Sequence, residues 1–363
     1  MTAARRAALA DVKVRNDTHA GLWLDKYLEA QTSEGDDDRN DKAKGAKSEL
    51  LAQVAGRKAP SGYREAFELR LSQAPAPGRV RLVGTATALG RVVVGLGQKG
   101  PAEIGITLEH TWGVPILPGS SLKGLAAAAA HLLHGGAEWS KPELDGSQPI
   151  ARTPNSFDWL FGTTEDRGAV DFLDAWWVPD DGFPLALDVM TPHHAEYYGA
   201  PEKADPPPPS DMDSPNPVSF LTSTGKFKVV IEGAPEWVQA AWELLRVGLS
   251  ELGIGAKTNA GYGRLELARE LSREEKEAAE LAKRWAGLDS IARELKGIGN
   301  ATQVFEKFAD AAQKGCPEQR LREVAALLVA GAHRKMWKDW VKKDSRKPEE
   351  KELFGKYFAS FVS

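Results

Sequence analysis

Apolar and polar positions follow two different periods along the chain. Before residue 77 and after residue 270, apolar residues recur every three to four positions, which predicts helices. Between these limits they alternate or form short β-branched and aromatic runs, which predicts strands mixed with a few helices. We therefore expect an N-terminal helical segment and linker over 1–76, a mixed domain over 77–270 and a C-terminal helical extension over 271–363.

The N-terminal segment predicts two helical stretches and a linker. Apolar spacing favours a short helix from Ala20 to Leu28 and a longer one from Lys47 to Leu71 that is interrupted near Pro60. Alternating alanine and proline then run from Ala74 to Gly78, a composition typical of an extended linker.

The middle segment predicts the order strand, helix, strands, helix, strand. Helices are expected from Ser120 or Ser121 as N-cap, at 155–161 and after Pro235, which suits a first helical turn. We expect the strand at 185–190 to pair with the one at 169–178. Strands are expected at 80–84, 92–94, 104–110, 169–178, 185–190, 218–222, 226–232 and 265–267. The order predicts an α+β fold with one antiparallel sheet and helices on one face.

A proline-rich insertion interrupts this domain. Residues 201–217 contain seven prolines, a density that excludes a regular helix and predicts an extended surface segment.

Composition narrows the classes of protein that the chain can represent. The 42% apolar content can fill a substantial core, and a net charge of −4 excludes a global attraction to polyanions. The single cysteine, Cys316, excludes an intrachain disulfide framework and a cysteine-clustered zinc site. No apolar run resembles a signal peptide or a membrane span. We expect a cytoplasmic protein without a metal or another cofactor.

A glycine-rich loop at 253–263 is the first candidate site. Four glycines in eleven residues allow positive φ angles and close approach of another chain, and free amides there can bind phosphate oxygens. The alternative is a helix C-cap followed by a turn with structural glycines. The candidate binding residues are Gly253, Gly255, Lys257, Thr258, Asn259, Gly261, Tyr262 and Arg264.

A helix start at 118–124 is the second candidate site. Ser120, Ser121 and Lys123 lie within one turn of the exposed amides of a helix start, which is a favourable place for a phosphate. The alternative is a well-capped helix with a solvated lysine.

The histidines allow an enzyme hypothesis. His110, His193 and His194 are candidates for a general acid or base, yet the sequence shows neither two histidines at four-residue spacing nor a nucleophile elbow. We expect these histidines to be structural, with catalysis as the alternative.

Taken together and in order, several motifs resemble the RAMP superfamily. Within it they are most similar to the sixth-subunit type of the Cmr effector complex of type III-B CRISPR systems, over about residues 20–269. The motifs are LEHTWGVPILPGSSLKGL at 108–125, GAVDFLDAWW at 168–177, DVMTPHHAEYY at 188–198, SPNPVSFL at 214–221 and the loop at 253–263.

The resemblance implies a ferredoxin-like (RRM-like) core with insertions and a non-catalytic role in antiviral defence. It implies that the glycine-rich loop and the helix start contact CRISPR RNA near its 3′ end. Its implied partners are CRISPR RNA, target RNA and other Cmr-type subunits, without a membrane. A subunit that holds only the phosphates and sugars of a guide RNA leaves the edges of its bases free to pair with the target.

Two alternatives and two departures from the family pattern stay open. The chain can also be a metal-independent endoribonuclease of the superfamily that processes precursor CRISPR RNA, or an assembly protein whose glycine segments are only turns. Relatives often carry an arginine shortly after the Lys-Gly of the helix start, whereas 125–130 is uncharged here. The extension from about 272 lies outside the resemblance. Its basic end with Trp337 and Trp340 can bind RNA, dock a neighbour or complete a core, and we expect docking.

Overall fold

A computed structural model of the chain shows two compact units. The first spans Met1–Glu270 and the second spans Leu271–Ser363. The structure describes residues 12–29, 41–100, 102, 104–146, 148–150, 152–180, 182–191, 194, 197–198, 200, 208, 210, 212, 217–271, 275–276, 279, 295, 298, 300–314, 316, 318–330, 334–342 and 346–362.

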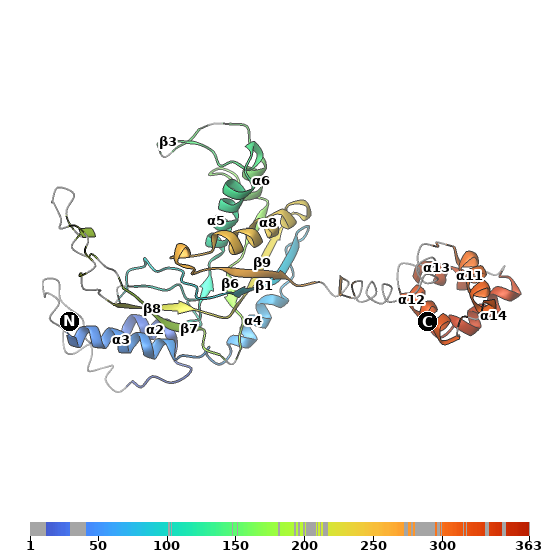
Figure 1. The fold of residues 1–363 in the computed structure, drawn as a ribbon, viewed down its shortest axis with the longest axis horizontal. Helices are drawn as coiled ribbons and strands as arrows, with labels where there is room; N and C mark the ends of the chain where they lie inside the picture. The colour runs from blue at the N-terminus through green and yellow to red at the C-terminus, as the bar shows by residue number, and fades with distance from the viewer. Residues whose placement is uncertain are drawn as a thin grey trace. The chain divides into compact units, whose positions relative to one another are not determined.

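The first unit is built on a six-stranded antiparallel sheet, so the predicted α+β class is confirmed (Figure 1). Its strand order is β10-β1-β9-β6-β2, and β5 also pairs with β9. In register, Ala88 pairs with Leu265 at one end of the sheet and Val80 pairs with Gly233 at the other. The strands are β1 (Val80–Ala88), β2 (Ile116–Leu117), β5 (Val170–Phe172), β6 (Ala175–Trp177), β9 (Lys226–Gly233) and β10 (Leu265–Arg269).

Helices α5 (Gly119–Ala129) and α8 (Pro235–Val247) cover one face of this sheet (Figure 1). Each continues into a π-helical turn, η1 (Ala130–His134) and η3 (Gly248–Leu252). The close contact between β1 and α8 requires a glycine at position 84, because a Cβ there would lie 2.5 Å from the Trp242 ring of α8. Buried Trp242, Leu245 and Leu249 belong to the core that this packing forms.

The helices expected within 77–270, α5 and α8, thus lie on one face as predicted, whereas a helix of the N-terminal segment covers part of the other face. Helix α4 (Tyr63–Ser72) packs against the opposite face, where Tyr63 stacks on Trp176 with 5.9 Å between ring centroids. Arg70 lies over the same indole, 4.6 Å from its centroid. The Tyr63 hydroxyl donates to the carbonyl oxygen of Trp177 at 2.5 Å. Aromatic packing on both faces therefore buries this part of the sheet.

Three expectations about strands are corrected. Residues 92–94 and 104–110 form isolated bridges at Val92 and Leu108, not strands. The expected strand at 169–178 is broken into β5 and β6 at Leu173 and Asp174, because the Asp174 carboxylate turns to the start of α5. Strand β7 (Leu185–Met190) pairs with β8 (Val218–Ser223) in a separate two-stranded sheet and not with 169–178.

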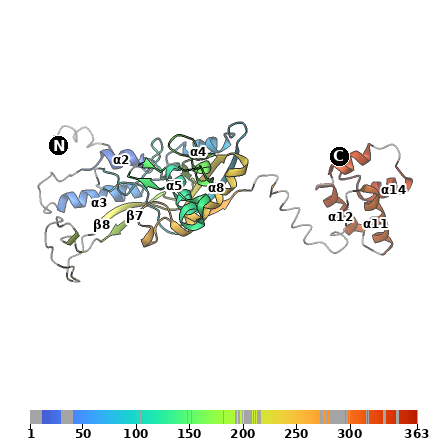
Figure 2. The same cartoon turned by 90° about the horizontal axis from the view of Figure 1, so that it is seen from above.

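The N-terminal helices pack with the β7–β8 sheet in a satellite core. Helix α2 (Ala20–Lys26) and helix α3 (Asp41–Ala55) lie side by side in both views (Figure 2). His19 caps α2: its Nδ1 accepts from the Leu22 N–H at 3.1 Å, and its Nε2 lies 3.0 Å from the His110 carbonyl oxygen.

Several short elements form the lobe that follows α5. They are η2 (Ala137–Trp139), β3 (Leu144–Asp145), β4 (Gln148–Pro149) and α6 (Ser156–Phe161). Most of the proline-rich insertion expected at 201–217 lies outside the described residues.

The second unit is helical and has its own core. Aromatic rings dominate that core, with Phe305, Trp337 and Phe358 in mutual contact at 4.3 to 5.6 Å between centroids. The helices whose bounds the described residues define there are α11 (Ala301–Gln313), α12 (Glu318–Ala330), α13 (Arg334–Val341) and α14 (Pro348–Tyr357).

Candidate functional site

The glycine-rich loop lies at the end of the main sheet where β1 ends and β10 begins. The Ala256 N–H donates to the Val93 carbonyl oxygen and the Gly263 N–H donates to that of Arg91, each at 2.8 Å. The Leu89 N–H donates to the Arg264 carbonyl oxygen at 2.9 Å. The loop is thus bonded to the connection that leads from β1 toward α5.

Packing inside this unit accounts for two of the loop's glycines. Gly255 has a φ of 89°, and a Cβ there would lie 2.2 Å from the Val93 carbonyl oxygen. Gly263 has a φ of 73°, and a Cβ there would lie 2.0 Å from the Ile254 carbonyl oxygen. A larger residue at either position would clash with backbone, so the shape of the loop itself requires these glycines.

The middle of the loop offers unpaired amides. Residues 258–260 form a single 3-10 turn, η4 (Thr258–Ala260), and Lys257 before it has a positive φ of 60°. Within the described residues, no acceptor is bonded to the N–H groups of Lys257, Thr258 or Asn259. Adjacent free amides beside a lysine side chain can bind an anion such as a phosphate.

Tyr262 and Arg264 hold the loop in place. The Tyr262 hydroxyl donates to Asp188 Oδ2 at 2.9 Å, which ties the loop to β7. Burial raises the pKa of Tyr262, and its hydrogen bond to the Asp188 carboxylate raises it further. Arg264 donates to the Ser250 carbonyl oxygen at 3.1 Å. Both predicted binding residues are therefore engaged in this unit, and Asp188, the first residue of the motif at 188–198, is a partner that the loop motif alone does not indicate.

At the second candidate site, the predicted serine cap is wrong. Pro118 is the N-cap of α5, and no side chain of 118–121 caps the helix. The Asp174 carboxylate accepts from the Gly119 N–H at 2.7 Å instead. A negative group from the β5–β6 break thus already satisfies the first amide of the helix.

The outer side of the α5 start is open. Ser120, Lys123 and Gly124 are exposed, and Ser121 is half-buried. A Cβ on Gly124 would meet nothing within 4 Å, so packing within the described residues does not require a glycine inside this helix. Close approach of another molecule would explain it.

The structure brings the two candidate sites to neighbouring elements without direct contact. Gly248 begins η3, which leads into the loop, and a Cβ there would lie 3.0 Å from Leu125 Cγ of α5. Among the described residues, no hydrogen bond or ion pair joins Ser120, Ser121 or Lys123 to the loop. The two sites thus lie on packed elements, and a ligand that used both would have to bridge them.

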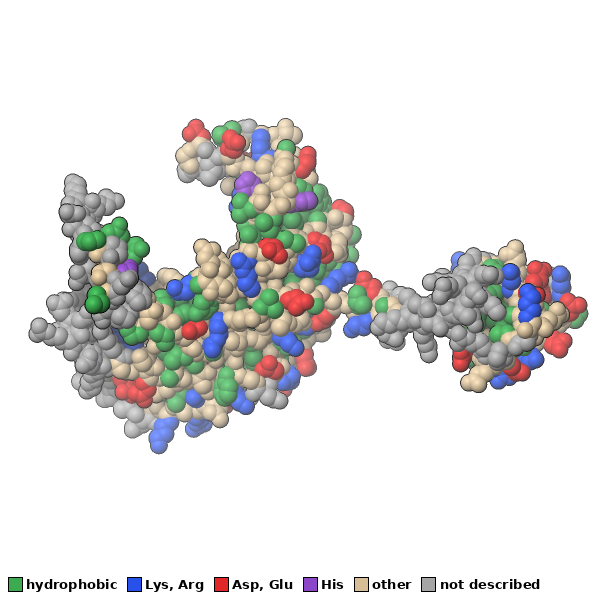
Figure 3. All heavy atoms as spheres, viewed as in Figure 1, with side chains coloured by type: hydrophobic (Ala, Val, Ile, Leu, Met, Phe, Trp, Pro, Cys, Tyr) green, Lys and Arg blue, Asp and Glu red, His purple; other side chains and the backbone are tan. Residues whose placement is uncertain are grey.

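Both faces of the main sheet carry charges of both signs. On the face shown in Figure 3, Lys and Arg side chains alternate with Asp and Glu side chains over α8 and the neighbouring strands. On the sheet face that α4 partly covers, Arg81 pairs with Glu232 and Lys228 pairs with Glu270. These paired charges leave that face of the sheet a poor surface for a polyanion.

The candidate histidines are not brought together by any described contact. His110 is exposed, and its carbonyl oxygen is bonded to the His19 side chain. His194 has a positive φ of 60°, and its carbonyl oxygen accepts from the Tyr198 N–H at 3.1 Å. His193 lies outside the described residues.

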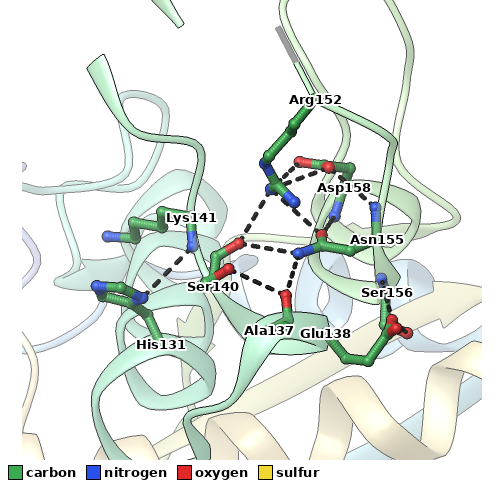
Figure 4. Close-up of polar contacts among 9 residues, drawn as sticks. All are labelled: His131, Ala137, Glu138, Ser140, Lys141, Arg152, Asn155, Ser156 and Asp158. Carbon is green, nitrogen blue, oxygen red and sulfur yellow. Dashed lines mark hydrogen bonds and ion pairs between the residues drawn. The ribbon is translucent and has the colours of Figure 1, made fainter. Parts of the chain in front are cut away.

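A polar network outside the candidate sites holds the lobe after α5 (Figure 4). Arg152 pairs with the nearly buried carboxylate of Asp158 at 3.0 Å and donates to the Ser140 carbonyl oxygen at 3.0 Å. Asn155 and Asp158 form a capping box at the start of α6, and the Asn155 amide donates to the Ala137 carbonyl oxygen at 2.7 Å. The Asn-x-x-Asp spacing was the sequence signal for this network.

Cavities and metal-binding clusters do not add a site here. A cavity of about 520 Å³ lies between α2, α3 and residues 12–14, and none of the predicted site residues lines it. Among the described residues, no group of three His, Cys, Asp or Glu side chains could hold a metal ion. No helix in the described part of the chain is long and apolar enough to cross a bilayer.

Comparison with known proteins identifies related sequences. The profile of the RAMP superfamily matches residues 85–266. The CRISPR system Cmr subunit Cmr6 of Pyrococcus furiosus is 31% identical over 48% of this chain and 64% of its own length. The CRISPR system CMR subunit Cmr6 of Saccharolobus solfataricus is 25% identical over 52% of this chain and 54% of its own length. The chain thus spans less than two thirds of either relative.

A solved structure of the type III-B Cmr-beta complex bound to cognate target RNA contains a chain with 20% identity and a TM-score of 0.49. The match covers 63% of this chain and 74% of that one. The resemblance inferred from the sequence motifs is confirmed by the superfamily match and by the two Cmr6 relatives.

Proposed function

Since this chain belongs to the RAMP superfamily, we propose that it is a non-catalytic subunit of an RNA-guided type III-B effector complex. In this proposal it holds the sugar-phosphate backbone of CRISPR RNA near the 3′ end. Its partners are that RNA, the target RNA and other Cmr-type subunits. Its role is target recognition in antiviral defence, in the cytoplasm expected from the sequence.

The observation that carries the proposal is the turn at 257–259. Three consecutive N–H groups without an acceptor, beside an exposed lysine, suit a phosphate group of any nucleotide. Helix α5 packs against the C-terminal end of α8, and the glycine-rich loop follows from that same end. One RNA strand could therefore contact both the exposed start of α5 and the loop. Such contacts leave bases unread, as a guide of arbitrary sequence requires.

We assign the core to a ferredoxin-like arrangement. In chain order the main elements are β1, α5, β6, β9, α8 and β10, and the strands lie in the spatial order fourth, first, third, second. All adjacent pairs are antiparallel. This order supports the βαββαβ plan.

A role in assembly and RNA retention requires no catalytic group. The nuclease alternative with His110, His193 or His194 stays a prediction.

The proposal is tested by removing the two exposed lysines. We expect the double variant Lys123→Ala, Lys257→Ala to bind guide RNA more weakly and with a smaller salt dependence. The slope of log Kobs against log salt should fall by about 1.4, because each single-strand phosphate contact contributes about 0.7. Binding of a labelled guide RNA is measured at several salt concentrations.

The matched control removes two exposed lysines of the same unit, Lys13→Ala and Lys58→Ala. It should leave the slope unchanged. Equal RNA retention by the double variant and the parent protein would refute the proposed site.

A further inference from the structure

The second unit carries a row of unpaired basic residues on the outer side of α13. The α13 row comprises Arg334, Lys335, Lys338 and Lys342, of which the last directly follows the helix. All four are exposed. Within the described residues none of them forms an ion pair, whereas Lys314, Arg322 and Lys356 of the same unit pair with Asp310 and Glu318.

Helix geometry places the row on one side and the aromatic residues on the other. At 100° per residue, Arg334, Lys338 and Lys335 project within an arc of about 100°. Trp337 and Trp340 project away from this arc and are 0% and 5% exposed in the core. The helix is thus fixed to its unit by the tryptophans, and its charges are left to solvent.

The spacing of the row suits a linear polyanion. Arg334 and Lys338 lie four residues apart, so their Cα atoms are separated by a rise of about 6 Å along the helix, and Lys342 follows at the same sequence spacing in the turn after it. This spacing is comparable to that of neighbouring phosphates along a nucleic-acid strand. Asp339 is the one acidic residue of α13, so the row keeps a strong positive charge although the whole chain carries −4.

The burial of the aromatic residues argues against insertion of α13 into a lipid bilayer. Helices that bind membranes insert exposed aromatic and large aliphatic side chains between the lipids. In α13 both tryptophans are in the core, and Val341, 37% exposed, is its one exposed large apolar residue. The exposed surface of the α13 row is therefore mainly charged, like the surfaces that bind the phosphate backbone of nucleic acids.

We propose that the α13 row binds the phosphate backbone of single-stranded RNA, as a second RNA contact outside the superfamily core. The choice of RNA as the strand rests on the function proposed above, whereas the basic row itself is independent of it. Because the row lies outside residues 85–266, it adds an RNA contact that the matched part of the chain does not contain.

The test neutralises the row in the full-length chain. The variant Arg334→Gln, Lys335→Gln, Lys338→Gln, Lys342→Gln should bind a labelled RNA of mixed sequence about tenfold or more weakly. Its salt slope should be smaller by about 3, since four single-strand contacts contribute about 0.7 each. Circular dichroism and the Tm of the variant should match those of the parent, because these side chains lie outside the core. The conservative variant Lys335→Arg, Lys338→Arg, Lys342→Arg should retain binding.

A matched control changes four other basic residues of the same unit: Lys307→Gln, Lys314→Gln, Arg322→Gln, Lys356→Gln. It removes the same charge, and we expect the RNA affinity and salt slope to stay near those of the parent. An unchanged slope in the α13 variant, or an equal loss in the control, overturns the proposal.

Three further probes distinguish RNA from an acidic protein, a lipid surface and DNA as the partner of the α13 row. Polyglutamate that displaces RNA as effectively as unlabelled RNA does would indicate an acidic protein and overturn the proposal. Vesicles containing phosphatidylserine that bind the parent but not the α13 variant, while RNA binding is unchanged, would do the same. DNA of the same sequence that binds through the row more tightly than RNA would contradict the choice of strand. Failure of the Lys123 and Lys257 variant with success here would refute only the core site.

Discussion

At the scale of single residues, internal packing requires some glycines and leaves another unexplained. Gly255 and Gly263 are explained by backbone that a Cβ would strike, so the fold itself requires them. Gly124 lies in a helix, and apart from the adjacent backbone of that helix no atom lies within 4 Å of its would-be Cβ. A helix-interior glycine is costly relative to alanine, and nothing within the described packing compensates for it.

We therefore expect Gly124→Ala to stabilise the free protein and weaken its RNA complex. The free energy of unfolding should rise by about 0.5–1 kcal/mol, because alanine loses less backbone entropy in a helix. Urea unfolding measures the first effect, and RNA titration measures the second. Gly45, a helix glycine of α3 that is also open, supplies the control: Gly45→Ala should leave RNA binding unchanged. Unaltered RNA affinity in Gly124→Ala would show that the RNA does not approach α5 closely.

At the scale of elements, tyrosine hydroxyls join segments that are distant in sequence. Tyr262 ties the glycine-rich loop to β7, and Tyr63 ties α4 to β6. Burial raises the pKa of Tyr63, and the charge of Glu109 raises it further, against the opposing effect of Arg70. Both phenols must stay protonated for these connections to hold.

This protonation predicts a loss of stability at high pH. A phenol whose pKa is raised in the folded state contributes its full stabilisation below the unfolded value of about 10. That stabilisation falls by up to about 1.4 kcal/mol per pH unit as the pH rises above it, because the unfolded chain releases its proton first.

Near pH 8, Tyr63→Phe should therefore lower the free energy of unfolding by about 1 kcal/mol, because the Trp177 carbonyl oxygen loses its donor. The variant should then unfold at a lower urea concentration than the parent. Above pH 10 its stability should decline less steeply than that of the parent. Urea titrations from pH 8 to pH 11 measure both effects. Parallel pH profiles for parent and variant would show that Tyr63 does not control the alkaline transition.

At the scale of the whole molecule, the two units bury separate cores. Trp242 lies in the core beneath α8, whereas Trp337 belongs to the core of the helical unit, and the two clusters share no residue. A core substitution in one unit should therefore leave the packing of the other intact.

Calorimetry of the full chain is expected to show two unfolding transitions. Trp337→Ala should lower one of them, at a cost of about 3–5 kcal/mol, because it opens a cavity among aromatic rings. Trp242→Ala should lower the other. A single transition that both substitutions shift would show that the units unfold together.

The local pattern determined most elements but not their partners. Helices around Trp23 and Trp242 followed from apolar spacing, and the strands around Val83, Val230 and Leu267 followed from alternation and β-branched residues. The superfamily was recognisable from motifs that survive as short strings.

Contacts between distant segments decided the rest. Asp174 replaces the expected serine at α5 because a carboxylate remote in sequence reaches the helix start, and β7 pairs with β8 because their register aligns across the insertion. In the loop, the tertiary structure separated packed glycines from the free amides at 257–259. Local propensity is encoded in neighbouring residues, whereas pairing and capping depend on which surfaces folding brings together, so only the tertiary structure reveals them.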